Sequence, residues 1–97
     1  MLVVIRKQNE VIFKGHAGFA DFGKDIVCAS ASSIMYTTVN ALKRLDKNAI
    51  DLEINKEGAI VKILRNNSLN KTLIDNMMDL LKDLEGDYPD NIKIKEE

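Results

Sequence analysis

The sequence predicts an α+β domain of element order ββαββα(β), in which two helices pack on a mostly antiparallel sheet. Short runs of apolar and β-branched residues occur in pairs, and a few polar residues separate the members of each pair, as in hairpins. Two longer segments have apolar residues at helical spacing instead. A length of 97 residues suits one small core, so we expect a single domain over residues 1–97.

The first half of the chain is expected to form a hairpin followed by a helix. The strands are predicted at 2–7 and 11–16, with polar residues turning the chain between them. The period then becomes helical from about Asp25 to Leu45, with Asp25 as the N-cap. One stripe of this helix carries small and apolar side chains, namely Cys28, Ala31, Ser32, Met35, Val39 and Leu42.

The second half follows from the same signals. Residues 50–55 alternate strictly between apolar and polar types, which predicts a strand with one solvent-facing side, and 56–58 turn the chain into a partner strand at 59–65. Ser68 begins a second helix, which Gly86 and Pro89 end. Residues 92–94 are expected to add a short last strand. The predicted apolar stripe of the second helix consists of Leu69, Leu73, Met77, Leu80 and Leu84.

Composition excludes several classes of partner. Lys and Arg number 14 against 15 Asp and Glu, so a net charge of -1 provides no basic surface for nucleic acid or anionic lipid, and neither is expected as a partner. No segment approaches the roughly 20 apolar residues that span a bilayer, and the apolar start reaches Arg6 too soon for a signal peptide. A single cysteine fits a reducing compartment, so we expect a cytoplasmic protein.

The chemically most informative segment is 15–28, which contains the only histidine, His16, and the only cysteine, Cys28. A thiol and an imidazole are the minimum parts of a cysteine nucleophile with its base. With Asp25 as N-cap, Cys28 would lie in the first helical turn, where unpaired N–H groups and the helix dipole favour a thiolate and an oxyanion. His16 would end the second strand, where Asp21 or Asp25 would be close enough to orient its ring.

The connecting residues 17–24 are expected to close over a bound substrate. Gly18 and Gly23 lie near the two ends of this segment, where hinges must absorb changes in φ and ψ. Phe19 and Phe22 would then line an apolar substrate groove. The alternative is a static connector whose phenylalanines belong to the core.

Other interpretations of these residues stay open. A lone cysteine on an apolar helix stripe is commonly a small buried hydrophobe, and a lone histidine at a strand end is commonly structural. A metal site would need additional ligands from Asp21 or Asp25, a mixture that structural zinc rarely has, so neither a metal nor another cofactor is expected. The residues alone also allow a non-catalytic interaction module, or another cysteine hydrolase such as a thioesterase or an amidase.

Two blocks of this segment resemble the signature of the ribosomal-processing cysteine protease family, Prp. They are Gly15-His16-Ala17-Gly18 and Gly23-Lys24-Asp25-Ile26-Val27-Cys28-Ala29, followed by Ser32. Chain length, element order and Tyr88-Pro89 are also similar to that family, so the resemblance covers nearly the whole chain. It implies that Cys28 is the nucleophile and that His16 is the general base and later the acid. Asp25 and Ser32 match positions that flank this dyad, without an assigned role.

The resemblance also implies a substrate and a setting. The family consists of bacterial, cytoplasmic, homodimeric endopeptidases that need no cofactor. They remove the N-terminal extension of one large-subunit ribosomal protein, cleaving after a pair of aromatic residues and before a small one. The expected partners are therefore this extension and a second copy of the chain.

Overall fold

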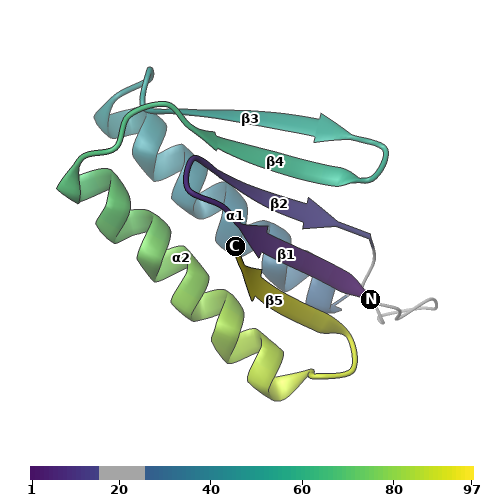
Figure 1. Ribbon diagram of the computed structural model, residues 1–97. Coiled ribbons are helices and arrows are strands. Elements are labelled where there is room, and N and C mark those ends of the chain that lie inside the picture. The colour runs from purple at the N-terminus through teal and green to yellow at the C-terminus, as the bar shows by residue number, and fades with distance from the viewer. Residues whose placement is uncertain (16–25) are drawn as a thin grey trace.

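The predicted element order is confirmed by a computed structural model, which describes residues 1–15 and 26–97 (Figure 1). The short last strand is present, so the sheet has five strands. The elements are β1 (Leu2–Arg6), β2 (Glu10–Lys14), α1 (Ile26–Leu45), β3 (Ile50–Asn55), β4 (Gly58–Ile63), α2 (Ser68–Asp87) and β5 (Ile92–Glu96).

The strands lie in the order β3-β4-β2-β1-β5. Three neighbouring pairs are antiparallel, and β1 pairs with β5 in parallel from Leu2 opposite Ile92 to Arg6 opposite Glu96. The first and last strands of the chain therefore lie side by side, and β3 forms one edge of the sheet.

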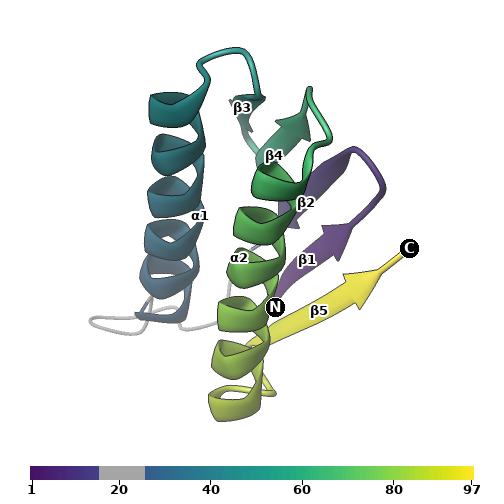
Figure 2. The ribbon, with the colours of Figure 1, turned by 90° about the vertical axis from the view of Figure 1, so that its left-hand side faces the viewer.

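Both helices cover the same face of the sheet (Figure 2). Alternate strand residues point toward them, as expected from the two-residue period of a strand. Val4 of β1, Val11 of β2 and Val61 of β4 are completely buried in the core cluster that the described residues form between the two layers. The helices contribute Val27, Ala31, Met35, Val39 and Leu42 from α1 and Ile74, Met77, Met78 and Leu81 from α2.

The buried face of α2 differs from the predicted stripe. Leu69 and Leu80 are 51% and 43% exposed, whereas the neighbouring row of Ile74, Met78 and Leu81 is buried together with Met77. The apolar arc of this helix is wider than one row, so the spacing of the leucines does not determine which row meets the sheet and α1. Leu73 and Leu84 lie partly buried at the margin of the core.

The first helix keeps most of its predicted stripe, with one exchange. Ser32 is exposed, and Thr38 occupies a buried position because its hydroxyl donates a hydrogen bond to the carbonyl of Ile34 at 2.9 Å. The second helix begins as predicted at Ser68. The side-chain oxygen of Asn67 caps it by accepting a hydrogen bond from the N–H of Asn70 at 2.9 Å.

Candidate active site

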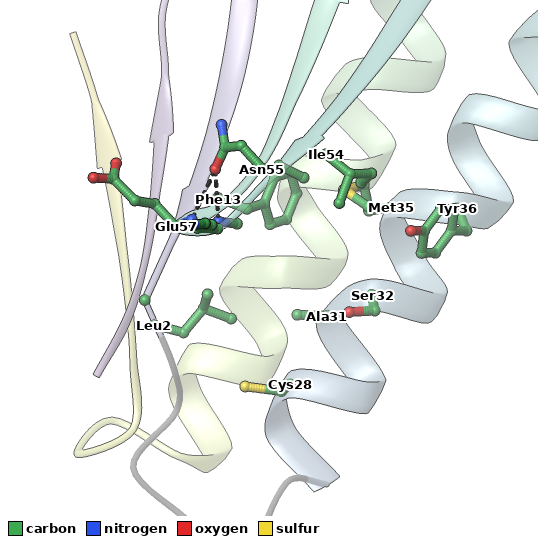
Figure 3. Close-up of a pocket in the computed structure, with 14 residues that line it drawn as sticks. Leu2, Phe13, Cys28, Ala31, Ser32, Met35, Tyr36, Ile54, Asn55 and Glu57 are labelled. Atoms are coloured by element: carbon green, nitrogen blue, oxygen red, sulfur yellow. Dashed lines mark hydrogen bonds between the residues drawn. The ribbon is translucent and has the colours of Figure 1, made fainter.

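A groove of about 290 Å³ opens between the first half of α1 and the turn that joins β3 to β4 (Figure 3). We call it the α1 groove. Residues from four strands, the turn and the helix line it. They are Leu2, Phe13, Gly15, Cys28, Ala31, Ser32, Met35, Tyr36, Ile54, Asn55, Lys56, Glu57, Gly58 and Ala59.

The floor of the α1 groove is apolar and exists because of one small residue. In the sheet, Ala59 pairs with Ile54 on one side and with Phe13 on the other. The methyl group of Ala59 is short compared with these two neighbours, so a hollow remains between them. Buried side chains, including Met35 of α1, close the hollow from below. A preformed apolar floor of this kind suits an apolar side chain of a ligand.

The wall formed by the β3–β4 turn is held by hydrogen bonds. The side-chain oxygen of Asn55 accepts hydrogen bonds from the N–H groups of Glu57 at 2.9 Å and Gly58 at 3.0 Å. Gly58 has a φ of 150°, and a Cβ atom there would lie 1.9 Å from the carbonyl oxygen of Phe13. Only glycine lets the turn approach β2 this closely.

Cys28 lies at one end of the α1 groove, in the first turn of α1 as predicted. It is partly buried, and it packs against the core while still lining the groove. N–H groups in the first helical turn have no partner within the helix, and the positive end of the helix dipole favours an anion there. The position therefore suits both a thiolate and the oxyanion formed when a thiolate attacks a carbonyl.

The chain leading toward His16 enters the same groove. β2 ends at Lys14, two residues before the predicted end of this strand. Gly15 ends the pairing because its φ of 83° departs from the extended conformation, and its N–H donates to the carbonyl of Glu57 at 2.8 Å. Gly15 lines the α1 groove together with Cys28, and Ser32 lines it one helical turn beyond Cys28.

Most of the other predicted site residues fall outside the described ranges 1–15 and 26–97. The proposed base, hinges, lid and orienting carboxylates therefore stay predictions. They are His16, Gly18, Phe19, Asp21, Phe22, Gly23 and Asp25, the last also predicted as the N-cap of α1.

The end of the α1 groove farthest from Cys28 is not predicted by the sequence. Tyr36 lies outside the predicted apolar stripe of α1, and the sequence predicts Ile54 only as part of an alternating strand. The signals available were weak: a tyrosine two turns beyond the cysteine, and an isoleucine directly before an Asn-Lys-Glu-Gly turn.

Within the described part of the chain, no three His, Cys, Asp or Glu side chains are grouped so that they could hold a metal ion. Neither helix in this part is both long and apolar enough to cross a membrane.

A partly buried thiol beside helix N–H groups and an apolar groove is suited to an enzyme that attacks an acyl group through cysteine. The family model of the cysteine protease Prp matches residues 3–93. The chain is thus a cysteine protease. It belongs to the Prp family.

Related proteins support the same assignment. The chain is 32% identical over 91 residues to the ribosomal processing cysteine protease Prp of Staphylococcus aureus, covering 91% of this chain and 86% of that protein. It is also 32% identical over 87 residues to Prp of Bacillus subtilis, covering 82% of this chain and 78% of that one.

Solved structures agree with the fold. The crystal structure of Prp from Staphylococcus aureus with a covalently linked product peptide has a TM-score of 0.84 to this chain at 25% identity, covering 99% of this chain and 97% of that one. The same protein with a substrate peptide gives a TM-score of 0.81, with the same identity and coverage.

Proposed function

We propose that this protein removes the N-terminal extension of a large-subunit ribosomal protein, with Cys28 as the nucleophile. The observation that supports this proposal most strongly is the position of Cys28, in the first turn of α1 and at one end of the α1 groove, whose floor is apolar. The related protein from Staphylococcus aureus is named a ribosomal processing protease and has been crystallised with a substrate peptide and with a covalently linked product peptide.

In the proposed reaction, His16 removes the proton of the Cys28 thiol, and the sulfur adds to the scissile carbonyl carbon. N–H groups at the start of α1 hydrogen-bond to the resulting oxyanion. The C–N bond then breaks as His16 returns the proton to the leaving amine, which leaves an acyl thioester on Cys28. Water attacks the thioester with His16 as the base, releasing a carboxylic acid and restoring the thiol.

Two features support His16 as the base. It is the only imidazole in the sequence, and it follows Gly15, which lines the α1 groove together with Cys28. We propose that Asp21 or Asp25 orients its ring, and that Ser32 contacts the substrate one turn beyond the nucleophile.

We further propose that Phe19 and Phe22 contact the substrate, with hinges at Gly18 and Gly23. The cleavage site proposed is the bond after an aromatic pair and before a small residue. The apolar floor of the α1 groove supports a preference for apolar side chains near this bond.

A cytoplasmic homodimer is part of the proposal. Within the described residues, both helices lie on one face of the sheet (Figure 2). Pairing across the strands puts Ile5, Ile12 and Ile60 together on the opposite face, where each is only partly buried. These apolar side chains are the kind of surface that a second copy would bury.

The test is to incubate the protein with the unprocessed ribosomal protein and measure product masses. We expect two products from one cut that follows an aromatic pair, and no product with Cys28→Ser, a change of one atom. Binding without cleavage by the wild-type protein would instead favour a non-catalytic interaction module. Hydrolysis of a simple thioester with no cut in the ribosomal protein would favour a thioesterase.

A further inference from the structure

Two large apolar side chains are exposed at the end of the α1 groove farthest from Cys28. Tyr36 is 49% exposed and Ile54 is 58% exposed, and both line the groove. Figure 3 shows them on either side of Met35, with Ile54 reaching across from β3. Exposed apolar side chains that gather around a concave surface mark binding sites more often than scattered ones do.

The distance from Cys28 to this pair matches a few residues of an extended peptide. Tyr36 follows Cys28 by eight residues, which is about 12 Å along α1 at roughly 1.5 Å per residue. An extended peptide advances about 3.3 Å per residue. A peptide that lies along the α1 groove with its scissile bond at Cys28 therefore brings its third or fourth residue from that bond to Tyr36 and Ile54.

We propose that Tyr36 and Ile54 form a distal specificity site, which binds an apolar side chain three or four residues from the scissile bond. This inference rests on the proposed peptidase function and adds to it a second site at which the protein recognises the substrate. The side chain would lie over Met35, which is 3% exposed and closes the bottom of the site. The Tyr36 hydroxyl can donate a hydrogen bond to a peptide carbonyl, a common use of tyrosine at binding surfaces.

The distal site is held in place before any ligand binds. Ile54 pairs with Ala59 in the sheet, and the next residue, Asn55, fixes the turn through its two hydrogen bonds. Tyr36 lies in the middle of α1, next to the buried Met35. A preformed site loses little conformational freedom on binding, so it contributes to discrimination between substrates.

The test compares peptides that differ only by leucine or serine at the third or fourth residue on either side of the scissile bond. For the wild-type protein we expect kcat/KM to favour leucine by about tenfold or more at one of these positions, as apolar pockets do. Ile54→Ser and Tyr36→Ser should each bring the ratio of kcat/KM between the leucine and serine peptides close to one, and the variants should still cleave at the same bond. Both side chains are exposed, so the variants are expected to fold, and thermal unfolding checks this.

Leu64→Ser is the matched control, because Leu64 is 59% exposed but lies beyond the other end of β4 and does not line the groove. It should keep the wild-type preference. If the wild-type protein cleaves these peptides but shows no leucine preference at any tested position, or if both groove variants retain it, the distal site is wrong while the peptidase function stands. If the wild-type protein cleaves none of the peptides, both proposals fail.

Discussion

Replacing Gly58 by alanine tests whether the wall of the α1 groove depends on the close approach of its turn to β2. The new Cβ atom would lie 1.9 Å from the carbonyl oxygen of Phe13, at a φ of 150° that side-chain-bearing residues rarely adopt. The contact is with backbone, so no side-chain rotation relieves it. The turn must move away from β2, which weakens the pairing of Gly58 with Lys14.

The expected loss of stability has two sources, the unfavourable φ of the new alanine and the weakened hydrogen bonds of the turn. An unfavourable φ costs about 1–3 kcal/mol. Moving the turn also weakens the hydrogen bonds that Asn55 accepts from the N–H groups of Glu57 and Gly58, each worth about 1 kcal/mol. We therefore expect Gly58→Ala to lower the free energy of unfolding by about 2–5 kcal/mol. For a domain of this size, this lowers Tm by at least about 8 °C.

Urea and thermal unfolding followed by circular dichroism measure this effect, and Gly86→Ala is the matched control. Gly86 lies in α2, and a Cβ atom there would have no neighbour within 4 Å. Alanine is favoured over glycine in a helix, so the control should be unchanged or more stable by up to about 1 kcal/mol. A Gly58→Ala protein within about 0.5 kcal/mol of the wild type would refute the account of this wall.

Three other predictions concern charge, catalysis and assembly. Hydrogen bonds from Arg6 and then Lys71 lower the pKa of Asp75 below its ordinary value of 3.8. Asp75→Asn should therefore lower the free energy of unfolding by under about 1 kcal/mol near neutral pH, because the carboxylate is 41% exposed. Urea unfolding at a series of pH values should show this difference vanish as the pH falls below 3.8 and through the pKa of Asp75 in the folded protein. Cys28→Ala and His16→Ala should each abolish peptide cleavage, and the double variant should be barely worse than either single variant because the two residues act as one unit; substantial peptidase activity in purified Cys28→Ala would contradict this. Light scattering at micromolar concentration should give a dimer, and the monomer mass of 10.9 kDa would reject it.

Local patterns in the sequence predict most of the fold, but not the arrangement of its layers. Strict alternation located β3, and helical spacing located both helices within a residue or two of their observed ends. The parallel pairing of β1 with β5 depends on contacts between the two ends of the chain, which no local pattern contains. Which row of α2 is buried could not be predicted for the same reason, because Leu80 and Leu81 are equally apolar and only packing distinguishes them.

In the candidate site, too, only the features that depend on local sequence signals could be predicted. The place of Cys28 could be predicted because the beginning of a helix is a local signal, and the structure confirms it. The distal end of the α1 groove could not, because Tyr36 and Ile54 are far apart in the sequence and line one groove only through the packing of α1 against β3. The depth of the groove likewise depends on Ala59 pairing between two larger residues.

The central claim, that Cys28 attacks a peptide carbonyl bound in the α1 groove, is tested most directly by trapping the acyl-enzyme. A substrate peptide ester is mixed with the protein, the reaction is quenched in acid within its first turnover, and intact masses are measured. We expect a mass increase equal to the acyl group minus the thiol hydrogen that it replaces, located by digestion on Cys28, and none with Cys28→Ala. An adduct on another residue, or Cys28→Ala cleaving at the wild-type rate, would contradict the account.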